Sequence, residues 1–336
     1  NLPVPERRAA EPLQAPGFEW VLGPWRQTGS LALDARWMRQ DTGATSQQGV
    51  VSTDFDWATH LWEPWFLQMR FGLGLVGVRD NTQGGDSGRV TGSSGGLTAR
   101  MSLQLFPASR FPFELRADMG DNRSSSDSLG TAVRHQRLSL SQSWRPEQGN
   151  LGLHLHLDHS RLLSDAGDDI LTSLQLGGHH QQGEHAMDAS GQLVLNQRSD
   201  LDEQQRLASF HLRHGFSPRP DLQVETLANW NDNRLHSGRR LGDDLGGSVR
   251  QLTSVVSWRP REGDPLYHPE LPLQLGASAR WSEVVVSNQG TSQRAQALAA
   301  TLGANLDLSA TWRLGASVAV NRVQAAQLSA DSANLN

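Results

Sequence analysis

Two histidines and an aspartate alternate with leucines in one short segment, which reads Leu-His-Leu-His-Leu-Asp. The polar members are His154, His156 and Asp158. Successive side chains of an extended strand point to opposite faces, so these three groups would share one face. Imidazole and carboxylate groups placed together can bind a metal ion or transfer protons. Any strand with polar residues on one face shows the same spacing, however, and we interpret the three residues as part of a polar wall.

A second group of histidines falls in residues 177–190, where the alternation of polar and apolar residues breaks down. It consists of His179, His180 and His185. Their spacing completes no recognised pattern of metal ligands. We therefore interpret this stretch as a solvated turn.

Four segments are rich in Asp, Asn, Gly and Ser, whose oxygen atoms can bind calcium. They are residues 80–86, 118–127, 165–169 and 231–244. None has the spacing of a calcium-binding loop, so turn formation is the stronger interpretation. Calcium binding stays open as an alternative, and we expect no metal and no cofactor.

Nucleophilic and nucleotide chemistry find little support in the sequence. The chain has no cysteine, which excludes disulfides and thiolate chemistry, and it has no G-x-S-x-G serine elbow. The glycines within residues 71–75 lie inside a predicted strand and precede no helix, unlike a phosphate-binding loop. We expect that the protein is not an enzyme.

The composition also limits the partners. The formal net charge is −5 and all 30 basic residues are arginine, but no basic stripe appears, which argues against nucleic acid. No apolar run is long enough to cross a membrane as a helix. The chain begins at Asn1 without a methionine or an apolar leader, as expected of an exported protein whose signal peptide has been removed.

Strict alternation is the dominant pattern of the chain. Residues 111–120 read F-P-F-E-L-R-A-D-M-G, which puts Phe, Leu, Ala and Met on one face of a strand and Glu, Arg and Asp on the other. The pattern recurs and predicts strands near residues 30–39, 50–61, 66–78, 97–106, 111–119, 133–144, 150–160, 170–178, 189–197, 206–216, 221–230, 249–258, 271–284, 295–308 and 311–323. Residues 1–29, which are rich in proline, are predicted to form an N-terminal tail or plug, and residues 30–336 the sheet.

The polar faces of these strands carry charges of both signs. We predict that the following residues line a lumen: Asp34, Arg36, Asp54, Asp56, Arg70, Arg100, Glu114, Arg116, Asp118, Arg137, His154, His156, Asp158, Arg213, Glu225, Arg280 and Arg313. A ring of one sign would indicate ion selectivity. This mixture instead predicts cross-strand ion pairs and a weak preference among ions.

The predicted connections differ between the two ends of the strands. Those at one end are short and carry aromatic residues, and those at the other end are polar and longer. We predict that the following aromatic residues lie at a membrane interface: Trp62, Trp65, Phe106, Phe111, Trp144, Phe216, Trp258 and Trp312. This asymmetry, with strands of about 9–11 residues, is typical of outer-membrane barrels.

In these features the chain resembles the porin-like class of Gram-negative outer-membrane β-barrels, without the motif of a specific family. The resemblance implies an all-β, transmembrane, antiparallel up-and-down barrel of about 14–16 strands that contacts outer-membrane lipid. Such barrels usually end on an aromatic residue, whereas this chain ends Ser-Ala-Asn-Leu-Asn, so we expect a C-terminal truncation.

Three functions follow from this interpretation. The first is a water-filled, weakly selective channel for small polar solutes. The second is a barrel that scaffolds an export or surface machine, with a protein partner in its lumen or at its periplasmic rim. The third is a secreted, soluble β-rich binding protein, which the long strands and the two unlike ends disfavour.

Overall fold

The computed structural model describes residues 21–41, 44–84, 88–126, 130–147, 149–238, 243–288, 291–308, 311–325 and 328–335. Every regular element in these ranges is a β-strand. Over the same ranges, no helix has the length and apolar character needed to span a membrane.

Sixteen strands follow one another in the described part of the chain. They are β1 (Arg26–Arg39), β2 (Thr45–Leu61), β3 (Leu67–Gln83), β4 (Arg89–Leu105), β5 (Phe113–Ser126), β6 (Gly130–Trp144), β7 (Leu151–Ser164), β8 (Gly167–Gln182), β9 (His185–Arg198), β10 (Glu203–Arg219), β11 (Leu222–Ser237), β12 (Asp243–Trp258), β13 (Leu273–Asn288), β14 (Thr291–Asp307), β15 (Arg313–Ala325) and β16 (Leu328–Leu335).

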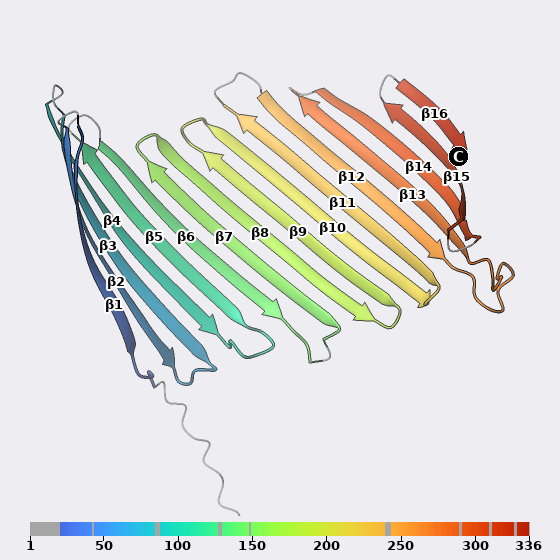
Figure 1. Cartoon of the computed structure of the whole chain (residues 1–336), viewed down its shortest axis with the longest axis horizontal. Helices are drawn as coiled ribbons and strands as arrows, with labels where there is room; N and C mark the ends of the chain where they lie inside the picture. Colours follow the sequence, from blue (N-terminus) through green and yellow to red (C-terminus); the bar gives the residue numbers. More distant parts are fainter. Residues whose placement is uncertain are drawn as a thin grey trace, which may run out of the picture.

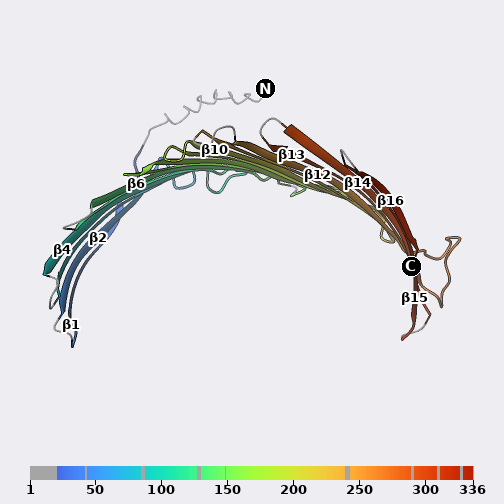
Figure 2. The ribbon, with the colours of Figure 1, turned by 90° about the horizontal axis from the view of Figure 1, so that it is seen from above.

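The strands form one sheet in which each strand pairs antiparallel with the next along the chain (Figure 1). Seen from above, the sheet curves into an arc (Figure 2). β1 and β16 are its two edges. The predicted all-β, antiparallel up-and-down architecture is therefore confirmed, and the strand number lies within the predicted 14–16.

Each of the fifteen predicted strands overlaps one of β1 to β15. Within residues 177–190 the connection is confined to residues 183–184, whereas His179 and His180 belong to β8 and His185 to β9, so the interpretation of this stretch as a turn is wrong. β16 was not predicted. Most of the predicted tail, residues 1–20, lies outside the described residues, whereas its last four residues open β1. At the edge of that tail, Leu22 forms a single bridge to Leu61.

The prediction of long loops at one end of the strands is wrong. Residues 80–96, for example, hold the end of β3 and the start of β4, which leaves a connection at residues 84–88. The polar segments continue the strands because backbone hydrogen bonds in a ladder do not depend on side-chain polarity. The longest connection, residues 259–272, lies at the opposite end, which we call the turn rim. The other end is called the loop end.

The register gives the sheet two unlike faces. Leu115 pairs with Leu103 and Leu140, while its neighbour Arg116 pairs with Ser102 and Ser139. Directly paired residues lie on the same face of an antiparallel sheet. One face is therefore apolar and the other polar near the turn rim.

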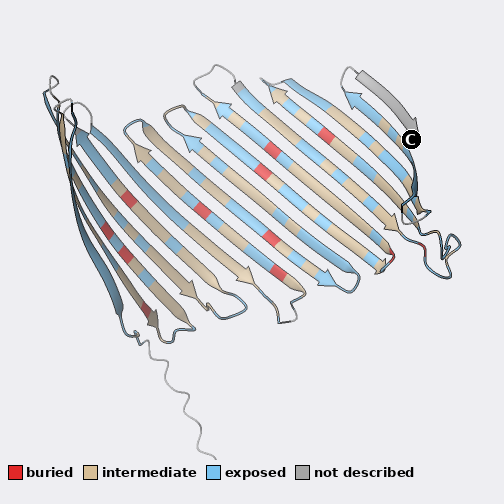
Figure 3. Cartoon of the chain, viewed as in Figure 1, coloured by how far each residue is buried: buried red, intermediate tan, exposed pale blue. Residues whose placement is uncertain are grey.

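Within the part of the chain that the structure describes, neither face is covered by a second layer. Figure 3 shows few buried residues, and among the residues described Ala208 is the one buried apolar residue. Leu31 and Leu33 on β1 are 70% and 73% exposed. A soluble protein rarely leaves a large contiguous apolar face in water, so this face needs an apolar environment.

The apolar face forms a band of nearly constant width, which we call the apolar band. On β3 it extends from Leu67 to Leu75 and on β13 from Leu273 to Trp281. At about 3.3 Å per residue, these eight steps measure roughly 26 Å along the strand. Strands of 16 and 17 residues therefore continue well beyond the band, toward the loop end.

The turn rim is packed with aromatic rings. The ring centroids of Trp62 lie 5.0 Å from Trp65 and 5.3 Å from Phe66, and Phe66 lies 5.2 Å from Phe106. Trp62 and Phe106 have left-handed backbone conformations, with φ of 63° and 50°. Bulky residues rarely adopt this conformation, so the edge-to-face packing must offset its cost.

Candidate functional site

The pairing register places all seventeen predicted wall residues on one face of the sheet, opposite the apolar band. We call this face the polar wall. That the polar wall lines a lumen stays a prediction. The eight predicted interface aromatics all lie at or beside connections of the turn rim, and their contact with a membrane interface likewise stays a prediction.

An ion pair bridges three strands of the polar wall. Asp56 on β2, Gly72 on β3 and Arg100 on β4 lie in one row of the register. Arg100 Nη2 donates to both carboxylate oxygens of Asp56, at 2.8 Å each. A Cβ atom at position 72 would lie 2.3 Å from Arg100 Nε and 2.8 Å from Asp56 Oδ1. The ion pair therefore needs a glycine between its two partners.

Further ion pairs follow along the same face. Arg137 Nε donates to Asp158 Oδ2 at 2.7 Å, and Arg213 Nε lies 2.7 Å from Glu225 Oε1. Others are Arg36 with Asp34, Arg116 with Glu114, and Arg313 with Asp307, and His135 Nε2 lies 3.2 Å from Asp118 Oδ2. The side chains of most of these cations are more than half exposed. Such pairs contribute only about 0–1 kcal/mol each, so they arrange the wall more than they stabilise it.

A charged hollow of about 410 Å³ lies on the polar wall across β2 to β5. Arg70, Arg100 and Arg116 line it together with Asp56, Glu114 and Asp118, so cations and carboxylates are equal in number. Among the described residues, Arg70 and Arg280 make no ion pair. Such a surface can hold water and small ions of either sign without binding one kind strongly.

The register keeps His154, His156 and Asp158 together on the polar wall, but it divides the second group of histidines between the two faces. His154 lies opposite Gly177 and His179 lies opposite Gly152, so each imidazole covers a glycine on the neighbouring strand. His180 and His185 lie on the other face. In the described part of the chain, no three His, Cys, Asp or Glu side chains are grouped as they would be around a metal ion.

We call the face that carries the apolar band the outward face. Toward the loop end its residues become mostly polar, a change that the sequence pattern did not predict. Beyond the apolar band most residues on that face are polar, charged or glycine, with exceptions such as Leu163 and Val285, and we call the charged ones the collar. Among side chains that the structure describes, they are Arg39, Arg79, Arg89, Asp121, Arg123, Arg134, Arg161, Asp168, Arg206, Asp232, Arg234, Asp244, Arg250, Glu283, Arg294 and Arg322. Eleven arginines against five carboxylates give the collar a net charge of +6, although the whole chain carries −5.

Glu283 is the most buried charged residue of the collar, with 3% of its surface exposed. Its carboxylate pairs with Arg294, accepts a hydrogen bond from Gln296 at 2.7 Å and lies 3.5 Å from Arg250 Nη1. Two arginines share one carboxylate here.

At the far end of β11, beyond the apolar band, the hydrogen bond to Asp244 and the attraction of its charge raise the pKa of His236.

No protein-family model and no curated protein matches the chain. The outer membrane protein opdK from Pseudomonas aeruginosa is 11% identical, with a TM-score of 0.31 over 92% of this chain and 97% of that protein. An anion-selective porin from Comamonas acidovorans is 11% identical, with a TM-score of 0.29 over 90% of this chain and 100% of the porin. A bacterial polysaccharide outer membrane secretin is 15% identical, with a TM-score of 0.29 over 93% and 94% of the two chains.

Proposed function

We propose that the sheet is the wall of a β-barrel in the outer membrane of a Gram-negative bacterium, and that it forms a water-filled channel for small polar solutes. One observation carries the proposal: the register separates a continuous apolar band from a continuous polar wall on the two faces of a single layer. The band spans nine residues along β3 and along β13, within the roughly 9–11 residues with which a tilted strand crosses a bilayer. The polar wall would then meet water inside.

Closure of the arc supplies the lumen. An edge strand presents unpaired backbone groups, which cost several kcal/mol each in lipid. β1 and β16 are the two edges, and pairing them would satisfy both. A barrel of about sixteen strands is wide enough to leave an aqueous channel.

The charges on the polar wall support a weakly selective channel. Positive and negative side chains alternate along the wall and neutralise each other in pairs. No long stretch of one sign is present on the described part of the wall near the apolar band. Selectivity between anions and cations should therefore be slight.

Conductance of the purified protein in a planar bilayer tests the proposal. The chain has no cysteine, so a single introduced thiol is the sole target of a charged, water-soluble thiol reagent. Ser102→Cys on the polar wall should lose conductance when the reagent is added, whereas its neighbour Met101→Cys in the apolar band should not. A folded, inserted barrel without conductance would contradict the channel, and equal block of both variants would contradict the assignment of the faces.

A second candidate, a barrel that holds a protein partner as an export conduit, has one observation in its favour. Near the loop end of β12 and β13, the polar wall carries Val249, Val284 and Val286, which are 40%, 39% and 53% exposed. Apolar side chains facing a lumen can contact a polypeptide. Under this candidate, the wild type would be silent in the bilayer and would conduct only after the partner is removed.

A further inference from the structure

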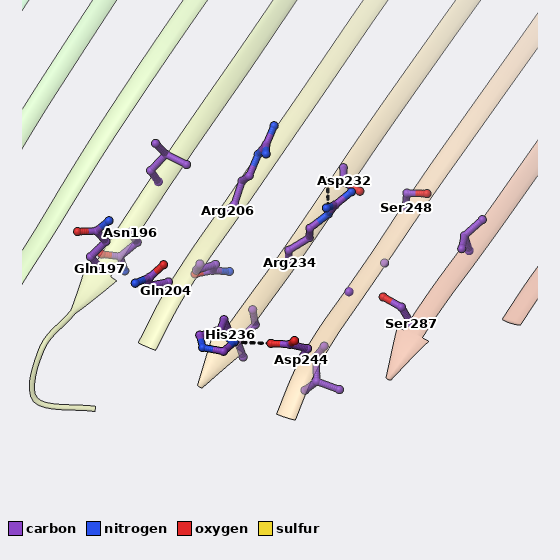
Figure 4. Close-up of a pocket in the computed structure, with 17 residues that line it drawn as sticks. Asn196, Gln197, Gln204, Arg206, Asp232, Arg234, His236, Asp244, Ser248 and Ser287 are labelled. Atoms are coloured by element: carbon purple, nitrogen blue, oxygen red, sulfur yellow. Dashed lines mark hydrogen bonds and ion pairs between the residues drawn. The ribbon is translucent and has the colours of Figure 1, made fainter. Parts of the chain in front are cut away.

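A hollow of about 560 Å³ opens on the outward face beyond the apolar band, at the loop ends of β9 to β13 (Figure 4). We call it the outer pocket. Its volume lies within the range of small-molecule sites, about 300–1,000 Å³. It lies on the face of the apolar band rather than on the polar wall, so it belongs neither to the proposed lumen nor to its ion pairs.

Small residues on β12 create the outer pocket. Gly246 is paired with Arg234 on one side and Ser287 on the other, and Ser248 is paired with Asp232 and Val285. A Cβ atom at position 246 would lie 2.5 Å from Ser287 Oγ. Gly246 and Ser248 therefore form the floor of the pocket, and the longer side chains of the neighbouring strands surround it.

Two arginines face each other in this pocket. Arg206 on β10 is paired directly with Arg234 on β11, and like charges directly opposite each other destabilise a sheet. Arg234 Nε donates to Asp232 Oδ2 at 3.1 Å. Arg206 makes no hydrogen bond or ion pair among the described residues. An anion between the two guanidinium groups would remove the repulsion.

Figure 4 shows Arg206 extended along β10, away from the β9–β10 connection. Its guanidinium group therefore lies toward the apolar band. On the same face, Phe210 and Trp230 are paired directly and continue from the pocket into the band. A molecule with its chains on these rings would bring its first charged group to Arg206.

The rest of the lining suits hydroxyl groups rather than a second anion. Gln197 and Gln204 offer amide donors and acceptors. Asp232 is 8% exposed, and its second carboxylate oxygen accepts no hydrogen bond among the described residues. Asp244 is held by His236. Amides and carboxylates beside one unpaired arginine match a sugar that carries a phosphate.

We propose that the outer pocket binds the phosphorylated sugar headgroup of a membrane glycolipid in the leaflet on the loop side. The phosphate lies at Arg206, the sugar hydroxyls lie at the amides and at Asp232, and the acyl chains lie along the apolar band. This inference rests on the membrane placement given under the proposed function, but it does not depend on conduction.

Binding to the full chain in detergent, followed by native mass spectrometry, tests the inference with three lipids. They are a monophosphorylated disaccharide lipid, the same lipid after enzymatic removal of its phosphate, and phosphatidylglycerol, which has a phosphate without a sugar. The first should bind at least tenfold more tightly than either of the others. Equal binding of phosphatidylglycerol would mean that only the general positive charge of the collar acts, and would overturn the proposal.

Matched variants locate the site. Arg206→Gln should weaken binding of the monophosphorylated lipid at least fivefold, and Ser248→Leu, which fills the floor without changing the charge, should do the same. Arg79→Gln removes an outward collar arginine far from the pocket, on β3, and should change binding less than twofold. Equal loss in all three variants would overturn the proposal.

The wild type separates this inference from the proposed function. Protein that conducts in bilayers and binds none of the three lipids would overturn the pocket and leave the channel standing. Protein that fails to insert into vesicles would overturn the membrane placement on which both depend.

Discussion

Exchanging the polarity of two adjacent residues on β5 tests the assignment of the two faces most directly. Leu115 lies within the apolar band, between Leu103 and Leu140, and Arg116 lies on the polar wall beside Glu114. Leu115→Arg places a charge against lipid, whereas Arg116→Leu places an apolar side chain against water. Each variant exchanges a leucine and an arginine at neighbouring positions, so the two variants differ mainly in the face of the sheet that carries the change.

The expected costs differ severalfold. An arginine on the lipid face near the midplane of a barrel costs about 2–4 kcal/mol. Arg116 Nε lies 2.6 Å from Glu114 Oε1, but its side chain is 61% exposed, and pairs of this kind contribute about 0–1 kcal/mol. Glu114 would also keep its hydrogen bond from Gln104 at 3.1 Å. We therefore expect Leu115→Arg to be the more harmful change by roughly 2 kcal/mol.

Folding into lipid vesicles across a urea series measures the difference. The folded and unfolded fractions can be separated by electrophoresis without heating, and the free energy of unfolding is obtained by linear extrapolation. Leu115→Arg should lower it by about 2–4 kcal/mol. Equal losses in the two variants, or a larger loss for Arg116→Leu, would refute the assignment of the faces.

Two further predictions concern ion pairs that span three strands. Gly72→Val should displace the ion pair formed by Arg100 and lower the free energy of unfolding by about 1 kcal/mol. In an Arg100→Ala background this loss should vanish. Simple additivity of the two substitutions in a double-mutant cycle, measured by urea unfolding, would contradict the contact. Glu283→Gln should lower the midpoint of urea unfolding, because its two arginine partners lose their shared carboxylate. The control is Asp34→Asn, at a half-exposed ion pair, which should leave the midpoint nearly unchanged. Equal shifts in the two variants would speak against a special role for Glu283.

The alternation of polar and apolar residues predicts the strands wherever one face of the sheet is apolar. It does not predict the parts of strands in which neither face is consistently apolar. β16 reads L-S-A-D-S-A-N-L, which has no regular exchange of polar and apolar residues. The alternation does not predict the loop ends of the other strands, because polar residues and glycines occur there on both faces. In each case the ladder of backbone hydrogen bonds continues although the side chains do not alternate between polar and apolar. A strand prediction based on that alternation therefore does not detect these segments.

The facing of the wall residues followed from the sequence, but their partners did not. Arg100 and Asp56 are 44 residues apart, and their contact depends on the relative register of β2, β3 and β4. The collar was missed for a related reason. Its arginines lie on the same face as the apolar band, and this becomes visible only when the strands are known to continue beyond the band.

The three-strand contacts bear on how the register is chosen. Backbone hydrogen bonds form equally well after a slip of two residues, which keeps every side chain on its face. A slip of β3 by two residues that brings Arg70 between Asp56 and Arg100 would break the contact of this row, whereas the opposite slip brings Gly74 there and leaves the space open. Glu283 contacts Arg250 on β12 and Arg294 on β14, so a slip of either strand would separate the shared carboxylate from a partner. The alternation thus fixes the face on which each side chain lies, while the ion pair between β2 and β4 and the shared carboxylate on β13 disfavour particular slips of the strands that they join.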